Sequence, residues 1–308
     1  MNENENNIWF IGTGKFAALC LEELTNNHIS FQRIITGLPT ISGRNKRENP
    51  SAVELTASSL GLKSERTGKL SENASLIKAL DDENPAIIFV IDFGQIIREP
   101  FLSRMCLNIH PSLLPEYRGA APIQRALLEG KKYTGVSVFR LVKAMDAGEI
   151  FSQKRIEISS DDNASNLYTR LSSIGSEIAA DAVKNIASLT FIQQDDSQAT
   201  YAQKLSKEDF VLSFAMTAKK FTDTVRALDM SGGAYAVIRS KRVKIWHALI
   251  REDIKSESPG KILDCTKNPV ISCADFGVEI LELQNEGKNK ISGAEWLRGM
   301  RLKLGEIL

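Results

Sequence analysis

The run AIIFVID at residues 86–92 limits the fold more than any other segment of this 308-residue chain. It is apolar at every position before Asp92 and rich in β-branched side chains, without the polar–apolar alternation of a half-exposed strand. Such a run is typical of a parallel strand that is covered on both faces. Parallel strands need crossover connections, which are usually helices. The segment therefore predicts an α/β domain with helices on both sides of a sheet.

The rest of residues 1–189 fits this architecture. An apolar run at residues 8–11 ends in Gly12-Thr-Gly14 and leads into a helical pattern from Phe16 to Leu24, which predicts a strand, a tight turn and a helix. Further predicted strands are residues 33–36, 86–92, 106–110 and 135–142, and further predicted helices are residues 51–60, 70–80, 122–128 and 161–187, the last interrupted around Gly175. We expect a doubly wound, Rossmann-like and mainly parallel sheet with right-handed crossovers.

The pattern changes after Leu189. Residues 193–200 are polar and are expected to connect two domains. A short helix at residues 217–228 then precedes five segments typical of strands, at residues 234–238, 243–248, 261–264, 270–273 and 278–283. Short strands separated by turns predict a small OB-like β-barrel. The expected organisation is an α/β domain at residues 1–189, a linker at 190–206 and a C-terminal barrel at 207–308.

The composition is that of a globular protein. Hydrophobic residues make up 43% of the chain, enough to fill two cores. The N-terminus is polar, and no stretch approaches the roughly 18 apolar residues that cross a bilayer, which predicts a cytoplasmic protein. The cysteines show no CxxC spacing, which argues against disulfides and zinc. They are Cys20, Cys106, Cys265 and Cys273, and the first two have apolar neighbours that predict core positions.

Charge is distributed unevenly along the chain. From residue 204 to the end there are 18 Lys and Arg against 14 Asp and Glu, whereas the preceding residues hold 21 against 24. A mildly basic C-terminal part is compatible with a polyanionic partner, and it is also compatible with an ordinary solvated surface.

The sequence Gly12-Thr-Gly14 could open a dinucleotide-binding turn, with Ala17 at the position of the third glycine. The second predicted strand, however, ends in Ile-Ile-Thr-Gly and offers no acidic residue for a ribose hydroxyl. We therefore expect a tight strand–helix turn whose helix N-terminus faces the cleft, and not a nucleotide site.

Three polar side chains form the strongest candidate site. Asn108 and His110 alternate on a predicted strand, so both project from one face, and the strand ends in a loop interrupted by prolines. Asp146 lies in a predicted turn, Met-Asp-Ala-Gly-Glu. A lone histidine or turn aspartate is usually structural, and we interpret His28 and His247 in that way. Together, however, an amide, an imidazole and a carboxylate suffice for acyl transfer to an amine without a covalent intermediate.

These motifs resemble the signature of the folate-dependent formyltransferases. The similarity is carried by Asn-Ile-His-Pro-Ser-Leu-Leu-Pro at residues 108–115, by Tyr-Arg-Gly-Ala-Ala-Pro-Ile-Gln-Arg at 117–125 and by Met-Asp-Ala-Gly at 145–148. Segments at residues 201–207, 225–228 and 243–246 resemble the second domain of those members that act on charged tRNA. The resemblance therefore covers essentially the whole chain.

The resemblance implies a reaction and its participants. The donor and co-substrate is 10-formyltetrahydrofolate, the acceptor is the α-amino group of methionyl initiator tRNA, and no metal takes part. Asn108, His110 and Asp146 match catalytic positions. The amide of Asn108 and an imidazolium at His110 donate hydrogen bonds to the oxygen of the tetrahedral intermediate, worth roughly 2.7–4 kcal/mol per donor. Asp146 stabilises the charged ring and assists proton transfer, in part through water.

The resemblance also implies two groups of binding residues. The implied folate contacts are Phe89, Val90, Ile91, Asp92, Phe93, Gly94, Gln95, Ile96, Ile97, Ser112, Leu113, Leu114 and Pro115. A loop at residues 38–49 matches the one that enters the tRNA acceptor end, and its basic residues are Arg44, Lys46 and Arg47. Further tRNA-binding candidates, for which an ordinary surface is the alternative, are Lys204, Lys207, Lys241, Arg242 and Lys244.

Three segments depart from the family pattern. Gly14 stands where the family usually has proline, which is expected to loosen the first turn slightly. The basic loop reads Arg-Asn-Lys-Arg at residues 44–47 in place of Arg-Gly-Lys-Lys, so its charge remains. Residues 229–234 lack the usual Asn-Pro-Trp-Pro. The catalytic assignment does not depend on any of these positions.

Other functions compete with this one. A related enzyme could formylate a sugar-nucleotide amine or hydrolyse formyl-folate, and a protein with an inactive transferase domain could bind RNA without catalysis. The basic C-terminal part argues against the first class. The intact set of Asn108, His110 and Asp146 argues against the second. We therefore expect a monomeric, two-domain transferase of translation initiation that acts on charged tRNA.

Overall fold

The computed structural model describes residues 7–42 and 47–308. The chain forms two compact units, each assembled from three separate stretches. The first unit contains Met1–Gly119, Tyr133–Glu157 and Tyr168–Ala202, and the second contains Ala120–Lys132, Ile158–Leu167 and Gln203–Leu308. Residues well before the polar connector therefore contribute to the second unit.

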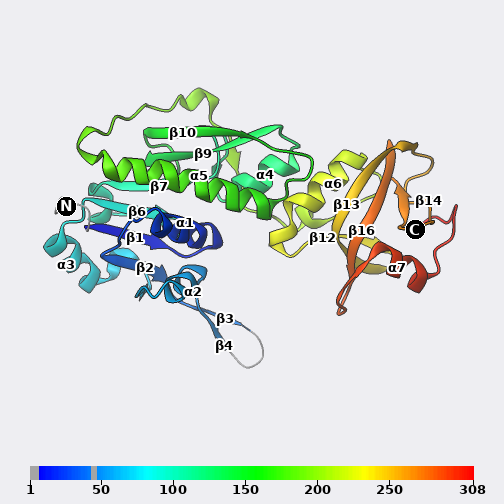
Figure 1. Ribbon diagram of the computed structural model, residues 1–308, viewed down its shortest axis with the longest axis horizontal. Coiled ribbons are helices and arrows are strands. Elements are labelled where there is room, and N and C mark those ends of the chain that lie inside the picture. The colour runs from blue at the N-terminus through cyan, green and yellow to red at the C-terminus, as the bar shows by residue number, and fades with distance from the viewer. Residues whose placement is uncertain (1–6, 43–46) are drawn as a thin grey trace. The chain divides into compact units, whose positions relative to one another are not determined.

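The first unit is built on a seven-stranded sheet with the order β10-β9-β7-β6-β1-β2-β5 (Figure 1). Its strands are β1 Ile8–Gly12, β2 Arg33–Gly37, β5 Glu65–Thr67, β6 Ile87–Ile91, β7 Cys106–His110, β9 Tyr133–Arg140 and β10 Ile150–Glu157. The strands from β5 to β7 are parallel, whereas β9 is antiparallel to β7 and β10 to β9. The expected doubly wound, mainly parallel sheet is confirmed. Every residue of β6 is buried, as its unbroken apolar run predicts.

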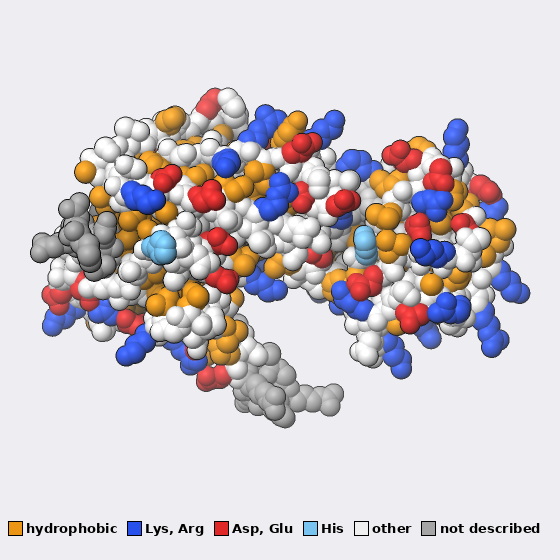
Figure 2. Space-filling view, in the orientation of Figure 1, with side chains coloured by type: hydrophobic (Ala, Val, Ile, Leu, Met, Phe, Trp, Pro, Cys, Tyr) orange, Lys and Arg blue, Asp and Glu red, His pale blue; other side chains and the backbone are white. Residues whose placement is uncertain are grey.

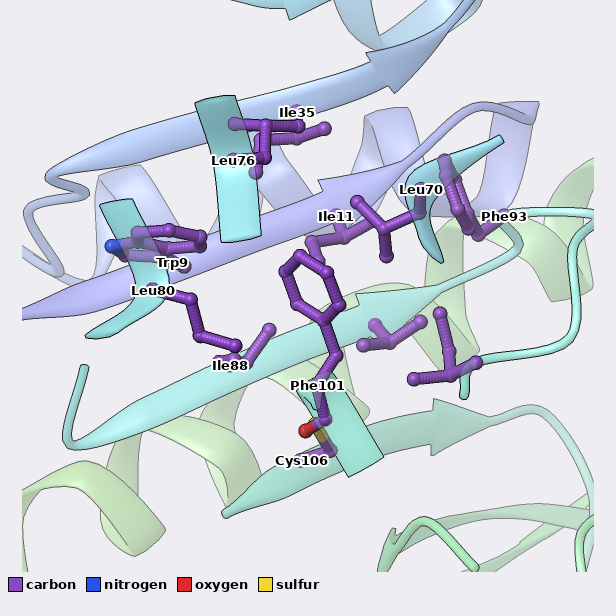
Figure 3. Packing of buried hydrophobic residues seen from close by; sticks show 12 residues of the cluster. Trp9, Ile11, Ile35, Leu70, Leu76, Leu80, Ile88, Phe93, Phe101 and Cys106 are labelled. Carbon is purple, nitrogen blue, oxygen red and sulfur yellow. The ribbon is translucent and has the colours of Figure 1, made fainter. Parts of the chain in front are cut away.

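Helices cover both faces of this sheet. They are α1 Lys15–Asn26, α2 Ala52–Ser59, α3 Ala74–Glu83 and α5 Ala164–Lys184, of which Tyr168 onward belongs to this unit. α1 and α5 lie on one face of the sheet (Figure 1). There the rings of Phe16 and Tyr168 meet edge to face, with 5.8 Å between their centroids. On the other face Leu76 and Leu80 of α3 join Trp9 in the main hydrophobic cluster (Figure 3).

Local signals explain where some helices begin. The helix expected at residues 70–80 starts with a 3₁₀ turn, and α3 itself begins at Ala74 after Asn73. The Asn73 side chain accepts a hydrogen bond from the N–H of Leu76, and the Ser51 hydroxyl does the same for Glu54 in α2. Each cap of this kind contributes about 1 kcal/mol.

The long helix α5 runs without a break, so the interruption expected around Gly175 is wrong. A Cβ atom at residue 175 would lie 2.3 Å from Cγ2 of Ile109 and 2.8 Å from Cγ2 of Val136. The glycine lets the helix approach β7 and β9 closely, and this packing outweighs the roughly 1 kcal/mol that glycine costs inside a helix. Ile109 therefore faces α5.

Several strands of the first unit have no counterpart in the sequence prediction. β5 and β10 lie at the two edges of the sheet. Because one side of an edge strand meets water, these strands are polar and lack the apolar run that marks the central strands. The other unexpected strands are β3 Thr40–Ser42, β4 Arg47–Asn49, β8 Arg118–Gly119 and β11 Tyr201–Ala202. β11 pairs in parallel with β8. The linker expected at residues 190–206, called the connector below, therefore belongs to the first unit as far as Ala202.

The second unit contains an antiparallel sheet with the order β12-β13-β16-β15-β14, and β17 pairs with β16. Its strands are β12 Ala234–Ile238, β13 Lys241–Lys255, β14 Ile262–Asp264, β15 Val270–Ser272, β16 Phe276–Asn285 and β17 Lys290–Ser292. Its helices are α4 Pro122–Leu128, α6 Ala218–Ala227 and α7 Gly293–Met300. The expected C-terminal domain of short strands is confirmed, and its sheet is antiparallel. β13 is longer than predicted because register shifts let it continue along β16, and neither β17 nor α7 was expected.

The remaining short helices are 3₁₀ turns. They are η2 Leu70–Glu72, η3 Phe101–Ser103, η4 Ile186–Ser188, η5 Asp196–Gln198, η6 Glu208–Phe210 and η7 Asp229–Ser231.

Cys20 and Cys106 are completely buried, as predicted, and all four cysteines are free thiols. Within residues 7–42 and 47–308, no helix has the length and apolar character to cross a membrane.

Candidate active site

Asn108 and His110 lie at the carboxyl end of β7, next to β9. Because Ile109 faces α5, strand alternation directs both polar side chains to the opposite face of the sheet. His110 pairs with Ser137 of β9 and is 5% exposed, whereas Asn108 is half-buried. In open α/β sheets, ligands bind at the carboxyl ends of the parallel strands. The pair therefore stands where this architecture places its binding sites.

The imidazole of His110 is held through one nitrogen and faces a carboxylate with the other. Nε2 lies 2.9 Å from the carbonyl oxygen of Tyr117. Because a carbonyl can only accept, Nε2 carries a hydrogen in both protonation states of the ring. Nδ1 is therefore the nitrogen left for other partners, and it lies 3.8 Å from Oδ2 of Asp146. The predicted meeting of His110 and Asp146 is present in the structure.

Asp146 reaches this position from the loop that follows β9. Its backbone φ is 50°, a conformation that few non-glycine residues adopt. Oδ2 accepts a hydrogen bond from the N–H of Gly119 at 2.8 Å, which fixes the direction of the carboxylate. A Cβ atom at residue 148 would lie 1.7 Å from the carbonyl oxygen of Arg140. The glycine of Met-Asp-Ala-Gly thus lets the loop fold back against β9.

A buried hydrogen-bond network supports the loop after β7. The hydroxyl of Ser137 donates to the carbonyl of Ser112 at 2.6 Å and accepts from the N–H of Leu114 at 3.0 Å. The Gln153 amide donates to the carbonyl of Leu114 at 2.7 Å. Ser112 and Leu114, both predicted folate contacts, are almost completely buried, and their main chains take part in this network. Leu113 and Pro115 remain partly accessible.

The other predicted folate segment, residues 89–97, is divided between core and surface. The buried members are Phe89, Val90, Ile91, Phe93 and Ile97. The accessible members are Asp92, Gly94, Gln95 and Ile96. Gly94 has a φ of 73°, and Ile96 is 71% exposed. Within residues 89–97, the accessible members therefore lie in the turn after β6.

Asp92 directly follows β6 and packs against the turn between β1 and α1. Its carbonyl accepts from the N–H groups of Thr13 and Gly14 at 3.1 and 3.0 Å, and its Oδ2 accepts from the N–H of Phe16 at 3.3 Å. A Cβ atom at residue 14 would lie 1.9 Å from Oδ2 of Asp92. The glycine that departs from the family pattern therefore makes room for this carboxylate, and proline at that position would also lack the N–H.

The Asp92 carboxyl group predicts a pH dependence of stability. Partial desolvation of this carboxyl group disfavours its charged form and raises its pKa to about 6, although the hydrogen bond from the N–H of Phe16 opposes the shift. Since an unfolded aspartate has a pKa of about 3.9, the folded protein binds more protons between these values. The stabilisation is therefore present below about pH 4 and is lost as the pH rises through 6.

Asp92→Asn keeps an acceptor for Phe16 and should flatten this dependence. Because the side chain still touches water, we expect Tm at pH 7 to rise by roughly 2 °C. Thermal unfolding from pH 4 to pH 7 measures the effect, with the exposed Asp161→Asn as control. Identical slopes for wild type and Asp92→Asn would contradict the assignment.

Comparison with known proteins places this site in a family. A protein-family model described as formyl transferase matches residues 6–183, more than half of the chain. The chain belongs to the formyl transferase family. A second model, formyl transferase C-terminal domain, matches residues 204–301. The carboxyl end of β7 and the Asp146 loop both fall within the first match.

Individual relatives extend the comparison. This formyl transferase is 32% identical over 308 residues to the methionyl-tRNA formyltransferase of Caldicellulosiruptor saccharolyticus, covering 98% of this chain and 99% of that protein. The solved methionyl-tRNA formyltransferase from Clostridium thermocellum matches with a TM-score of 0.57 and 18% identity, over 90% of this chain and 99% of that one. HypX from Aquifex aeolicus, solved with tetrahydrofolic acid, has a TM-score of 0.65 and 16% identity, over 97% of this chain and 48% of that one. The two solved structures share the fold.

The predicted polyanion contacts of this formyl transferase lie in separate places. Arg44 and Lys46 are outside the described residues, and Arg47 is the first residue of β4. The candidates of the second unit are exposed or half-exposed, and they are Lys204, Lys207, Lys241, Arg242 and Lys244. Lys and Arg side chains alternate with acidic ones over the unit that carries β13 (Figure 2). The view therefore shows a surface of mixed charge.

The sheet register adds a cation that the sequence did not single out. Across four strands Tyr235 is opposite Lys244, Lys244 is opposite Gln284, and Gln284 is opposite Lys290. The ammonium of Lys290 lies 3.9 Å from the ring centroid of Trp246, a cation–π contact. Lys290 thus shares a face with Lys244 although the two are far apart in the sequence.

Proposed function

We propose that this chain is an enzyme that transfers the formyl group of 10-formyltetrahydrofolate to the α-amino group of methionyl initiator tRNA. The observation that carries the proposal is the pairing of His110 with Asp146, 3.8 Å apart at the carboxyl end of β7. The acceptor is supported by the full-length relative, which is named a methionyl-tRNA formyltransferase. Charged tRNA is a substrate of translation, so we also infer that the enzyme works in the cytoplasm.

The proposed reaction is a direct attack of an amine on an acyl carbon. The neutral amino nitrogen forms a bond to the formyl carbon, and the electron pair of the C=O bond moves to oxygen. The amide of Asn108 and Nδ1–H of a protonated His110 donate hydrogen bonds to that oxygen. When the C=O bond re-forms, the bond to the folate nitrogen breaks. The attacking amine loses one proton, and the folate nitrogen gains one.

His110 and Asp146 divide the proton chemistry between them. Because Nε2 of His110 is bound to the carbonyl of Tyr117, Nδ1 is the only ring nitrogen available to the reacting groups. Oδ2 of Asp146 places a negative charge 3.8 Å from Nδ1, and the N–H of Gly119 keeps that oxygen directed toward the ring. Acting through this ring, the carboxylate then assists the transfer of the proton that the amine releases.

We infer that folate binds at the accessible part of residues 92–97 and beside Leu113 and Pro115. Gly94 has no side chain and a φ of 73°, so the backbone there can approach a flat ring closely. Backbone N–H and C=O groups in such a turn suit the alternating donors and acceptors of a pterin. The buried strand residues beneath the turn give it a rigid base.

We further propose the domain roles expected from the sequence. Residues 1–189 form the catalytic domain, 190–206 the connection, and 207–308 the tRNA-binding domain of a monomer. The two family matches, at residues 6–183 and 204–301, support this division. Sedimentation of the purified protein as a single monomeric species tests the oligomeric state.

The basic loop supplies a prediction about tRNA. In Arg44→Ala with Lys46→Ala, binding of methionyl-tRNA should weaken, and the slope of log K against log salt should fall by roughly 2, because two phosphate contacts are lost. KM for formyl-folate should stay near that of wild type. The double variant Lys63→Ala with Lys78→Ala removes two exposed lysines elsewhere and serves as control. Equal losses for tRNA and folate would refute the role of the loop.

The proposed function is tested by offering one enzyme several acceptors. Purified protein is incubated with labelled 10-formyltetrahydrofolate and either methionyl-tRNA, an amino sugar nucleotide or no acceptor. We expect label on methionyl-tRNA alone. Label on the sugar would instead indicate a sugar N-formyltransferase, and release of free formate without an acceptor would indicate a hydrolase.

A further inference from the structure

Part of the polar connector lies directly against the candidate active site. β11 pairs with β8, with Tyr201 opposite Arg118 and Ala202 opposite Gly119. A Cβ atom at Gly119, where φ is 118°, would lie 2.8 Å from the carbonyl oxygen of Ala202. Gly119 is also the residue whose N–H holds the Asp146 carboxylate. The connector therefore packs on the segment that orients one member of the His110–Asp146 pair.

Gln194 of the connector binds the main chain of the Asp146 loop. Its side chain is buried, and Oε1 accepts from Nε and Nη2 of Arg118 at 3.1 and 2.7 Å. Nε2 donates to the carbonyl oxygens of Asp146 and Gly148 at 2.8 and 2.7 Å. Arg118, also buried, forms an ion pair with Asp196 at 2.6 Å. The amide thus joins the loop, the Arg118 side chain and the connector.

Thr200 of the connector holds the peptide that binds His110. Its hydroxyl accepts from the N–H of Tyr117 at 2.8 Å, and its carbonyl accepts from the N–H of Arg118 at 2.9 Å. Tyr117 has a φ of 59°, a costly conformation for a residue other than glycine, and such a conformation persists only where its surroundings enforce it. The carbonyl of this residue is the acceptor of Nε2 of His110.

We propose that Gln194 and Thr200 are positioning residues for formyl transfer, which fix Asp146 and His110 in their mutual orientation from outside the reacting pair. The inference rests on the roles given to His110 and Asp146 in the proposed function. Neither connector residue needs to touch substrate. Oxyanion donors act only when they are aimed correctly, and a misplacement of about 1 Å can cost roughly 100-fold in rate. The buried amide of Gln194 is hydrogen-bonded through both its oxygen and its nitrogen, and it therefore holds the Asp146 loop in place.

Gln194→Met tests the first contact, because it keeps the length of the side chain and removes its hydrogen bonds. We expect kcat to fall by roughly 10- to 100-fold while KM for both substrates stays close to wild type. Gln194→Glu keeps an acceptor for Arg118 but loses the donors to Asp146 and Gly148, so kcat should fall here as well. The matched control is Gln198→Ala, an exposed glutamine of the connector that bonds to Asp195.

Thr200 allows a test by conservative rescue. Thr200→Val retains the shape of the side chain but removes the acceptor for the N–H of Tyr117, and kcat should fall by about 10-fold. Thr200→Ser restores the hydroxyl and should restore kcat. A merely structural role would lower the amount of folded protein in Thr200→Val without changing kcat per folded molecule. If Gln194→Met does not fold, the Thr200 pair decides the question.

His110→Ala, assayed beside these variants, separates the two proposals. Substantial turnover by His110→Ala would remove the proposed function itself. An inactive His110→Ala together with wild-type kcat in Gln194→Met and Thr200→Val would overturn the connector inference alone. A rise in KM at unchanged kcat, or an equal loss in Gln198→Ala, would also overturn it.

Discussion

His110→Ala should lower kcat for formyl transfer by about 1000-fold. Removal of a single oxyanion donor typically costs 100- to 1000-fold, and this histidine also takes part in proton transfer. KM for methionyl-tRNA should change little, because the bulk of tRNA binding comes from phosphate contacts elsewhere. Single-turnover assays with labelled formyl-folate measure the effect and are insensitive to slow product release.

The control for this prediction is His247→Ala. His247 is exposed on β13 of the second unit, so its loss should leave both folding and kcat unchanged. His110 is 5% exposed, and circular dichroism should show that the alanine variant remains folded. Turnover by His110→Ala within tenfold of wild type would remove this side chain from the mechanism.

The core of the candidate site was accessible to sequence reasoning because it depends on local geometry. Strand alternation puts Asn108 and His110 on one face whatever the rest of the chain does. The unbroken apolar run of β6 demanded a parallel strand covered on both sides, and the structure buries every residue of it. The contact between Asp146 and His110, by contrast, could be expected only from the resemblance to the formyltransferases. A turn aspartate far along the chain gives no indication of which residue it will contact.

The connector shows what the sequence could not reveal. Residues 193–200 are polar, and polar segments between patterned regions usually read as linkers. Gln194 and Thr200 gain their meaning from partners such as Asp146 and Tyr117, which are 48 and 83 residues away. Nothing in local composition separates Gln194 from Gln198, which stays exposed. Arg118 of the Arg-Gly-Ala motif is buried and requires an acceptor, but that burial is known only from the structure.

Glycine provides a second example. Gly14 appeared to be a departure that loosens a turn, yet its space is filled by the Asp92 carboxylate. Gly175 appeared to interrupt a helix, yet it lets that helix approach Ile109. In both cases the sequence shows the missing side chain, and only the fold shows which neighbour occupies its place. How closely two elements approach depends on the residues of both, so a glycine in one of them does not by itself predict the contact.

Asp146→Ala should lower kcat by about 100-fold or more, because general acid–base assistance and support of the imidazolium are lost together. Asp146→Asn keeps an acceptor for the N–H of Gly119 and so preserves the loop, but it removes the negative charge beside His110. If charge is what matters, the two variants should be similarly slow. The exposed Asp161→Asn should match wild type.

The double variant His110→Ala with Asp146→Ala distinguishes a cooperating pair from two independent groups. If Asp146 acts through His110, removing it has little further effect once the ring is absent, and the double variant should be about as slow as His110→Ala alone. Independent groups would multiply their losses, to about 100 000-fold in total. The 3.8 Å separation of Nδ1 and Oδ2 and the shared support of both residues by the connector favour the first outcome.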